Sequence, residues 1–363
     1  MIRIAFVGLG AAVRNIHLPA CRRLRGRVAV VGGCDPDTSA RQRATAAGVP
    51  VVFAEVDEMI ERTRPDLVAV CTPPALHRPQ VEQALAAGCH VFCEKPLAPS
   101  LVDADGIAAA AVRAGRAVIV NTEFPFMRIH AAARALIGTP MFGQLRYLHA
   151  WHTMAPTAET EAGWRENLGA RLGMEFGIHV FDLVRFFFDA TPVRVLAHMP
   201  RPDPRIVWDV INVVGVEFAD GRAASLVLDR LSRGPERYLD LRLDGDHAAI
   251  HTSLGGQLRM GVGLHTRERR PFADIRIAGG GRAVLERGTR WRTIATDGLN
   301  PFAAATARLL QRFTDALEGR GPMPRGDVAD HRASLALVFA SYESATRGCA
   351  VSVDQPGRPL GPS

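Results

Sequence analysis

Over the first 121 residues, short apolar runs alternate with segments that carry apolar residues at helical spacing. The apolar runs predict strands at 2–7, 28–34, 67–71, 91–93 and 117–120. Helices are predicted between them at 17–24, 41–47, 56–62, 78–87 and 102–114. Because strands that alternate with helices build a parallel, doubly wound sheet, residues 1–121 are expected to form an α/β domain.

From about residue 122 the pattern changes, and a second domain is expected over 122–363. A helix at 131–137 and a strand at 144–152 are followed by a polar, glycine-containing loop at 154–173. Helices are also predicted at 175–188, 301–317 and 328–346. Antiparallel strands are predicted at 193–199, 211–218, 223–229, 238–243, 248–252, 257–262, 273–277 and 291–296.

A glycine-rich turn, Gly8-Leu9-Gly10-Ala11-Ala12-Val13, follows the first predicted strand. Gly8 permits a tight turn, and Gly10 lets a pyrophosphate approach the backbone at a helix N-terminus. Val13 stands where the dinucleotide motif GxGxxG has its third glycine. Since that glycine packs the helix on the strand, the departure concerns helix placement more than phosphate binding.

Asp35 ends the second predicted strand, where a carboxylate can bind the ribose hydroxyls of a dinucleotide. A carboxylate there repels a 2′-phosphate, so NAD is favoured over NADP. Arg41 and Arg43 lie close by in sequence and could instead bind such a phosphate. Alternatively, Asp35-Pro36-Asp37 forms only a turn and a helix start.

Lys95 is the only lysine among the 44 Lys and Arg residues, and it follows a predicted strand within Glu94-Lys95-Pro96. A compact ammonium group can serve as a point donor with a tunable pKa, which a guanidinium cannot. Pro96 restricts the geometry of the residue before it. These features predict a chemical role for Lys95, although a single lysine can also remain in an arginine-rich chain by chance.

The predicted helix at 175–188 is apolar around most of its circumference, which indicates burial. Glu175, His179 and Asp182 fall on one narrow face of it, at i, i+4 and i+7. Glu175 could then fix the tautomer of His179 and raise its basicity. The alternative is an ordinary ion pair beside a histidine of the core.

Composition excludes several classes of protein. With 47% hydrophobic and 22% charged residues, the 363-residue chain is typical of a globular protein with two domains. Its net charge of +7 is spread along the chain, which argues against nucleic-acid binding. No leader or membrane-spanning run is visible, and six cysteines without a CxxC pair indicate free thiols and no metal site. A cytoplasmic protein is therefore expected.

Together these motifs resemble the Gfo/Idh/MocA family of nicotinamide-dependent oxidoreductases over nearly the whole chain. The segment that leads into Glu94-Lys95-Pro96 is the most specific of them. The resemblance rests on Gly8-Leu9-Gly10 with His17-Leu18-Pro19-Ala20, Cys34-Asp35-Pro36-Asp37, Cys71-Thr72-Pro73-Pro74 with His77 and Ala84, residues 87–97, Trp164-Arg165, and Gly177-Ile178-His179 with Asp182.

The resemblance implies an N-terminal Rossmann domain and a C-terminal α+β domain with an open, mostly antiparallel sheet. That sheet would make the contacts of a homo-oligomer, a dimer or a tetramer. Lys95 would meet the reacting oxygen, His179 would carry the proton and Glu175 would assist it. The implied cofactor-binding residues are Gly8, Gly10, Ala11, Ala12, Val13, Asp35, Thr72, Pro73, His77, Glu94, Lys95 and Asn121. The implied substrate-binding residues are Lys95, Trp164, Arg165, Arg171, Glu175 and His179.

Three departures from the family pattern lie on the substrate side. Glu175 stands where the family usually has Asp, and Arg171-Leu172-Gly173 stands where it commonly has a Gly-Gly run. An arginine that often follows the Asn121 position is missing from 122–125. These differences concern the choice of substrate more than the fold.

The activity that the resemblance implies is the interconversion of a secondary alcohol and a ketone on a sugar, cyclitol or related polyol. Two alternatives remain open. One is a glycosidase or lyase that uses NAD transiently, and the other is a non-catalytic nucleotide-binding sensor. Retention of both Lys95 and His179 argues against the sensor, because a pure binding protein does not need that pair.

Overall fold

The computed structural model describes residues 1–155, 164–165, 170–203, 205–206, 208–233, 237–255, 259–265, 270–276 and 280–353. The chain divides into two compact units. The first contains Met1–Met127 with Phe302–Phe339 and Val353, and the second contains Arg128–Pro301 with Ala340–Ser352. Residues 302–339 thus belong to the first unit, whereas the sequence pattern assigned all of 122–363 to one domain.

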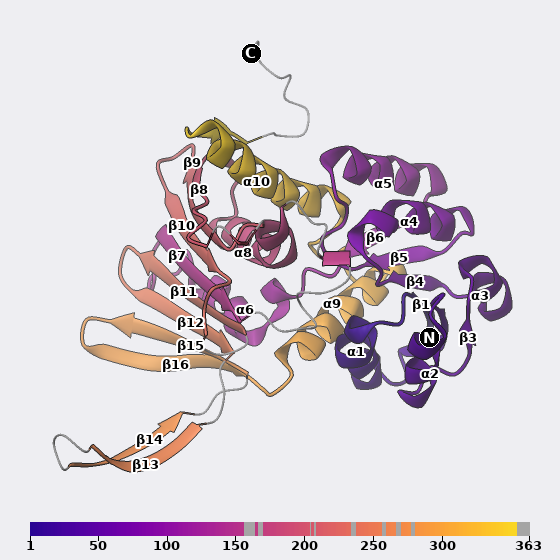
Figure 1. Ribbon diagram of the computed structural model, residues 1–363, viewed down its shortest axis with the longest axis horizontal. Coiled ribbons are helices and arrows are strands. Elements are labelled where there is room, and N and C mark those ends of the chain that lie inside the picture. The colour runs from indigo at the N-terminus through magenta and orange to yellow at the C-terminus, as the bar shows by residue number, and fades with distance from the viewer. Residues whose placement is uncertain are drawn as a thin grey trace. The chain divides into compact units, whose positions relative to one another are not determined.

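The first unit is built on a six-stranded sheet with the order β3-β2-β1-β4-β5-β6 (Figure 1). All its neighbouring strands are parallel, which confirms the predicted doubly wound sheet. The two-residue β3 is absent from the prediction, because so short a run has no periodicity. The strands are β1 (Ile2–Val7), β2 (Val28–Cys34), β3 (Val52–Phe53), β4 (Leu67–Val70), β5 (His90–Cys93) and β6 (Val118–Val120).

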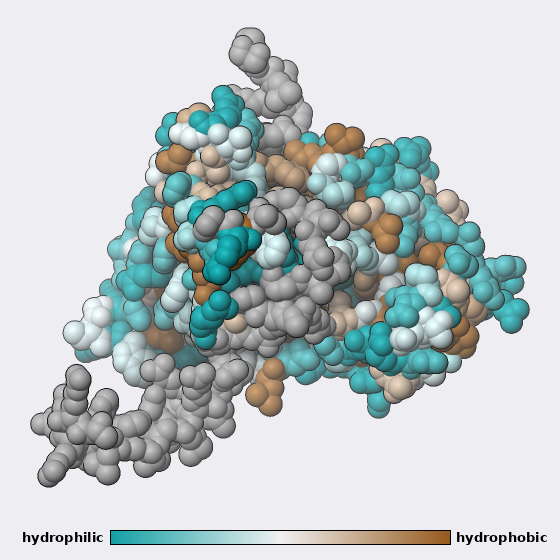
Figure 2. Space-filling view, viewed as in Figure 1, coloured by the Kyte–Doolittle hydropathy of each residue, from teal (hydrophilic) through white to brown (hydrophobic). Residues whose placement is uncertain are grey.

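Helices connect these strands, and two of them begin at side chains that accept backbone hydrogen bonds. Asp37 accepts from the N–H groups of Ser39 and Ala40, and Ser100 accepts from that of Asp103. The first unit's face in Figure 2 is mostly hydrophilic, with scattered hydrophobic residues. The helices are η1 (Val13–His17), α1 (Leu18–Arg23), α2 (Thr38–Ala46), α3 (Val56–Thr63), η2 (Pro74–Leu76), α4 (His77–Ala86), α5 (Leu101–Ala114), η3 (Phe124–Phe126), α9 (Pro301–Leu317) and part of α10 (Val328–Arg347).

The second unit contains a nine-stranded sheet with the order β16-β15-β12-β11-β7-β10-β9-β8-β17. Only the β10–β7 pair among its neighbours is parallel, which confirms a mostly antiparallel sheet. β15 and β17 are absent from the prediction, and β13 and β14 form a separate two-stranded sheet. The strands are β7 (Leu145–Met154), β8 (Pro192–His198), β9 (Ile211–Phe218), β10 (Ala223–Asp229), β11 (Arg237–Gly245), β12 (Ala249–Gly255), β13 (Arg259–His265), β14 (Arg270–Arg276), β15 (Gly281–Arg287), β16 (Arg290–Asp297) and β17 (Val351–Ser352).

Burial alternates along the strands of this sheet, as expected where one face packs on helices. Helix α6 (Arg128–Leu136) contacts β12, β15 and β16, and α8 (Ile178–Phe188) contacts β7. A π-helical turn, η5 (Gly173–Gly177), leads into α8. Among the described residues, no helix is both long and apolar enough to span a bilayer.

Candidate functional site

The candidate cofactor residues of the first unit follow the carboxyl ends of four neighbouring strands. Gly8 follows β1, Asp35 follows β2, Thr72 follows β4, and Glu94 and Lys95 follow β5. Carboxyl ends of parallel strands lie at one edge of a sheet. The order of the strands reverses between β1 and β4, which is where doubly wound sheets bind their ligands.

Gly8 and Gly10 have different surroundings. Gly8 has φ +85°, and a Cβ atom on it would lie 2.8 Å from Thr72 Cγ2 and 2.9 Å from the Cys71 carbonyl oxygen. No atom lies within 4 Å of the corresponding position on Gly10. Gly8 is therefore required by the fold, whereas Gly10 leaves room for a ligand beside the backbone.

The helix after this turn accommodates Val13 without a glycine. Val13 is fully buried and begins the π-helical turn η1. Its side chain packs into the core, and the residue as a whole exposes no surface to a ligand. Ala11 and Ala12 precede it in helical conformation.

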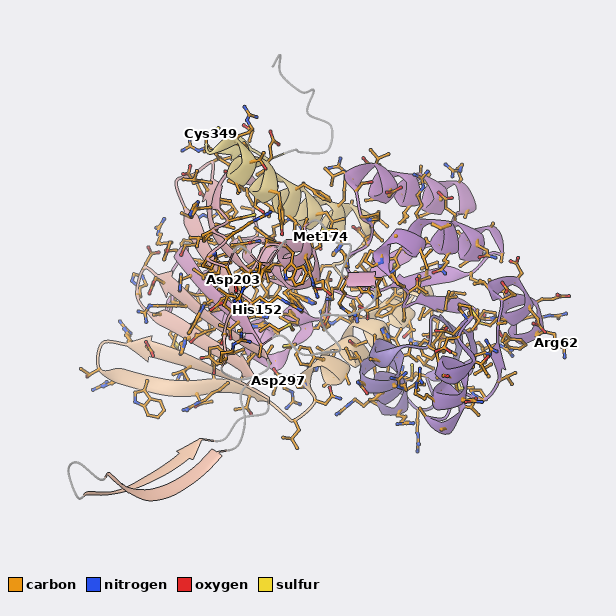
Figure 3. All side chains as sticks on the ribbon, viewed as in Figure 1. Arg62, His152, Met174, Asp203, Asp297 and Cys349 are labelled. Carbon is orange, nitrogen blue, oxygen red and sulfur yellow. The ribbon has the colours of Figure 1, made fainter. Side chains whose placement is uncertain are left out.

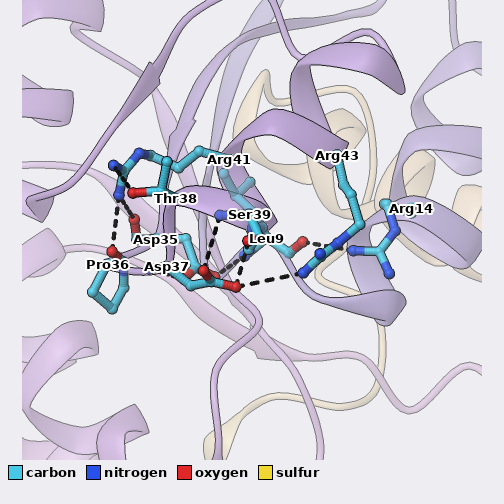
Figure 4. A network of polar contacts seen from close by, with 10 residues as sticks. Leu9, Arg14, Asp35, Pro36, Asp37, Thr38, Ser39, Arg41 and Arg43 are labelled. Carbon is cyan, nitrogen blue, oxygen red and sulfur yellow. Dashed lines mark hydrogen bonds and ion pairs between the residues drawn. The ribbon is translucent and has the colours of Figure 1, made fainter.

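Asp35 joins the end of β2 to the glycine turn (Figure 4). Its Oδ2 accepts a hydrogen bond from the Leu9 N–H at 2.8 Å, and its Oδ1 accepts from the Asp37 N–H at 2.9 Å. A carboxylate has about four lone-pair sites, so Asp35 can still accept hydrogen bonds from ribose hydroxyls. The residues present thus fit a dinucleotide.

The arginines next to Asp35 already have partners in the same network (Figure 4). Arg41 donates to the carbonyl oxygens of Asp35 and Pro36, at 2.7 and 2.9 Å, and to the Thr38 hydroxyl at 2.9 Å. Arg43 lies 3.4 Å from the Asp37 carboxylate. Both guanidinium groups are therefore engaged within the protein.

Glu94 lies in a largely buried hydrogen-bond network that no motif of the sequence indicates. Its Oε1 lies 2.6 Å from His17 Nε2 and accepts from Asn121 Nδ2 at 2.8 Å. The Lys95 N–H donates to Oε2 at 3.2 Å, and Thr306 donates to Asn121 Oδ1 at 3.2 Å. The sequence showed His17 only as part of the family motif His17-Leu18-Pro19-Ala20, which does not indicate its partner.

His17 and Glu94 form a buried ion pair. Burial alone lowers the pKa of His17, but Cys71 and Glu94 outweigh it and raise the pKa to about 10. Burial alone raises the pKa of Glu94, but His17 and Lys95 outweigh it and lower the pKa to about 2. At neutral pH the imidazolium thus holds the carboxylate that precedes Lys95.

The other predicted residues of this unit divide into partly exposed and buried ones. Lys95 is half-buried, and its peptide bond with Pro96 is cis. Thr72 donates to Gln80 Oε1 at 2.5 Å, and Pro73 is half-buried. His77 is fully buried, with its ring nitrogens 2.7 Å from the Thr72 carbonyl and 3.2 Å from the Leu97 carbonyl. His77 thereby connects the loops that follow β4 and β5.

The second unit brings most of the predicted substrate residues together. Arg165 Nε lies 2.5 Å from Glu175 Oε1, and Arg171 Nε lies 3.4 Å from Glu175 Oε2. The guanidinium of Arg165 stacks on Trp164 at 4.5 Å, and that of Arg171 stacks on Trp208 at 4.7 Å. Glu175 is therefore a buried carboxylate that pairs with two guanidinium groups, each of which stacks on a tryptophan.

The helix that carries Glu175 and His179 is not regular. Glu175 lies in the π-helical turn η5, and His179 lies in the first turn of α8; both are buried. A π-turn adds a residue to the turn, so the 100° spacing behind the predicted polar stripe does not apply across it. Close packing explains its glycines: a Cβ atom on Gly173 would lie 2.6 Å from the Tyr342 ring, and one on Gly177 would lie 2.7 Å from Leu228.

Comparison with known proteins gives a match to both units. Residues 2–122 match the family described as "Oxidoreductase family, NAD-binding Rossmann fold", and residues 130–251 match the "GFO/IDH/MocA C-terminal domain".

The described residues contain no group of three or more His, Cys, Asp or Glu side chains arranged to hold a metal ion.

Two curated relatives and a solved structure align over nearly the whole chain. Inositol 2-dehydrogenase from Pseudarthrobacter chlorophenolicus is 31% identical, with 99% of this chain and 98% of the relative covered. D-apiose dehydrogenase from Paraburkholderia graminis is 29% identical, with 96% and 89% covered. An oxidoreductase from Agrobacterium radiobacter, crystallised with NAD+, L-tartaric acid and magnesium, has the same fold with a TM-score of 0.81, at 20% identity and 97% and 98% coverage.

The two glycines of the turn should respond differently to alanine. Gly8→Ala forces a positive φ and a backbone clash, so we expect the free energy of unfolding to fall by roughly 1–3 kcal/mol. Gly10→Ala should leave that free energy within about 0.5 kcal/mol while weakening dinucleotide binding about 10-fold. Urea unfolding and calorimetric titration measure both. Equal losses of stability in the two variants would contradict the assignment.

The His17–Glu94 pair should make the stability depend on pH in a defined direction. His17 has a raised folded pKa, so its contribution is full below pH 6.5 and is lost as the pH rises toward about 10. Glu94 has a lowered folded pKa, so its contribution is full above pH 4.5 and is lost as the pH falls toward about 2. Urea unfolding should therefore show the largest gap between the native protein and His17→Gln near pH 5–6.5. A gap that stays constant up to pH 9 would count against the pair.

Proposed function

Since the chain belongs to the Gfo/Idh/MocA family of NAD(P)-dependent oxidoreductases that act on CH–OH groups, we propose that it oxidises a secondary alcohol of a sugar, cyclitol or related polyol reversibly. The observation that carries the proposal is the alignment of Gly8, Asp35, Thr72 and Glu94-Lys95 along one edge of the parallel sheet. The names of two relatives, an inositol and an apiose dehydrogenase, support the substrate class.

In the proposed mechanism, the bound nicotinamide supplies hydride chemistry, and side chains of this chain handle the oxygen and its proton. Lys95 donates a hydrogen bond to the reacting oxygen and stabilises its developing negative charge. His179 takes the hydroxyl proton during oxidation and returns it during reduction. Glu175, held by Arg165 and Arg171, tunes the proton affinity of His179.

We propose NAD as the preferred cofactor. The Asp35 carboxylate retains acceptor sites for two ribose hydroxyls, and its negative charge disfavours a 2′-phosphate. Arg41 and Arg43, the residues that could neutralise such a phosphate, are already paired with protein oxygens. Both observations favour NAD over NADP.

On the substrate side, Trp164, Arg165, Arg171 and Glu175 form a cluster of charged and aromatic groups. Trp164 and Arg165 are partly exposed and suit a ligand with several hydroxyl groups, because a guanidinium group donates hydrogen bonds. The buried Glu175, paired with Arg171, holds Arg165 in place. A suitable panel therefore includes cyclitols, aldoses and sugar acids.

Activity with NAD and that panel should depend on Lys95 and His179. Lys95→Ala and His179→Ala should each lower turnover on the order of 10²-fold, because each removes a proton or charge partner of the reacting oxygen. NAD affinity should stay within about threefold, since neither side chain is assigned to phosphate or ribose binding. Nicotinamide absorbance reports turnover, and calorimetry reports affinity.

Two matched variants serve as controls for that experiment. Lys95→Arg keeps a positive charge but replaces the compact donor, so it should remain impaired. His198→Ala removes an exposed histidine of β8 in the same unit and should retain full turnover. Unchanged turnover in Lys95→Ala or His179→Ala would remove that residue from the mechanism. Tight NAD binding without oxidation of any polyol would reject the proposed reaction.

Cofactor preference should follow the charge at residue 35. Asp35→Ser removes the carboxylate and should raise the ratio of kcat/KM with NADP to that with NAD on the order of 10-fold. Asp37→Ser removes the carboxylate that caps α2 and pairs with Arg43, and because Asp35 remains it should raise the ratio less than Asp35→Ser does. A larger shift of the ratio in Asp37→Ser than in Asp35→Ser would show that Asp35 is not the residue that selects the cofactor.

A further inference from the structure

The helix that carries Glu175 and His179 begins without a capping side chain of its own. Helical conformation starts at Arg171, and the residue before it is Ala170, which has no acceptor on its side chain. The first N–H groups of a helix have no partner within the helix and need acceptors from elsewhere. Gly173 and Gly177, at the two ends of the π-turn, lower the intrinsic stability of this part of the helix further.

Two side chains from distant parts of the second unit supply the missing acceptors. Asp209 Oδ1 accepts hydrogen bonds from the N–H groups of Arg171, at 3.0 Å, and Leu172, at 3.2 Å. The Tyr342 hydroxyl oxygen accepts from the Gly173 N–H at 2.9 Å. Three consecutive N–H groups at the start of the helix are thus bound by residues 37 or more positions away in sequence.

Asp209 and Tyr342 are also bound to each other. Asp209 is 4% exposed, and its Oδ2 accepts hydrogen bonds from the Tyr342 hydroxyl and, at 3.0 Å, from Asn212 Nδ2. Burial raises the pKa of Tyr342, and the negative charge of Asp209 adds to that effect. The phenol therefore stays protonated, donates to Asp209 and accepts from Gly173.

The cap leads directly to the candidate substrate residues. Arg171 is bound to Asp209 through its N–H group, and its guanidinium pairs with Glu175 one turn later. Fixing the main chain at Arg171 therefore fixes the start of the turn that carries both Arg171 and Glu175. The π-turn that follows packs against the ring of Tyr342, since a Cβ atom on Gly173 would clash with it.

We propose that Asp209 and Tyr342 are positioning residues for the substrate site: they hold the first turn of the helix so that Arg171 and Glu175 are correctly placed. The inference rests on the proposed function, because it takes the cluster around Glu175 to form the substrate site. It adds a dependence of the site on two residues outside the motifs of the sequence, one before β9 and one on α10.

The second unit offers a matched control for a purely structural cap. Asp297 is also a buried carboxylate, and it accepts hydrogen bonds from the N–H groups of Arg128 and Ile129 at the start of α6. Helix α6 carries none of the candidate site residues. Figure 3 labels Asp297, which caps α6, and Met174, which lies in the π-turn that follows the N–H groups bound by Asp209.

Hydrogen exchange and kinetics of Asp209→Ala and Asp297→Ala test the inference. Asp209→Ala should speed amide exchange at residues 171–173 about 10-fold or more and lower kcat/KM for the alcohol by a similar factor. NAD affinity should stay within about twofold, since the first unit binds it in the proposal. Asp297→Ala should speed exchange only at the start of α6 and leave kcat/KM within about twofold.

Two further variants keep the test decisive if Asp209→Ala folds poorly. Asp209→Asn retains an oxygen that can accept from Arg171 and Leu172, so it should recover part of both losses. Tyr342→Phe keeps the ring but removes the acceptor of the Gly173 N–H, so faster exchange should centre on that amide.

The outcomes separate this inference from the proposed reaction. Unchanged exchange at 171–173 in Asp209→Ala and Tyr342→Phe would overturn the cap. Faster exchange with unchanged kcat/KM would overturn its link to the substrate site while the reaction itself stands. A wild-type protein that binds NAD but oxidises no alcohol would instead reject the reaction and, with it, the claim that the cap serves a substrate site.

Discussion

The parallel alignment of β2, β1, β4 and β5 is the constraint on which the cofactor half of the site depends. It places the loops after four strands at one edge of a sheet, so that residues scattered between positions 8 and 95 of the chain lie in neighbouring loops. Charged groups at such an edge are costly to bury unless they are paired. Asp35 is satisfied by backbone N–H groups, and Glu94 is paired with the His17 imidazolium and bound to Asn121.

Glu94 and Asp35 differ in how many further hydrogen bonds they can accept. From the described residues Asp35 accepts two hydrogen bonds, both from the backbone, and it remains able to bind hydroxyl groups. Glu94 is held by two side chains and by the N–H group of Lys95, so it orders the segment from which the single lysine projects. A compact ammonium on an ordered backbone suits a donor that must meet one reacting atom.

In the second unit, the helix that carries Glu175 and His179 is stabilised mainly by long-range contacts. This helix starts after an alanine and passes through a π-turn with glycine at both ends, so local sequence stabilises it weakly. Long-range acceptors, Asp209 and Tyr342, compensate for that weakness. The geometry of Arg171 and Glu175 therefore depends on contacts made by the segment before β9 and by α10.

The sequence by itself determined the doubly wound sheet, the glycine turn, the place of Asp35 at the end of the second strand, and the family. These are accessible from the sequence because periodicity and short motifs are local properties. Local patterns also predicted α9, Pro301–Leu317, with the bounds that the structure shows. They did not show that residues 302–339 belong to the first unit, that β10 runs parallel to β7, or that β15 lies between β12 and β16. Only the tertiary structure decided these points, together with the His17–Glu94 pair and the Asp209 cap. In each case the partners lie far apart in the chain, and no local pattern specifies which distant residue satisfies a buried charge or a free N–H group.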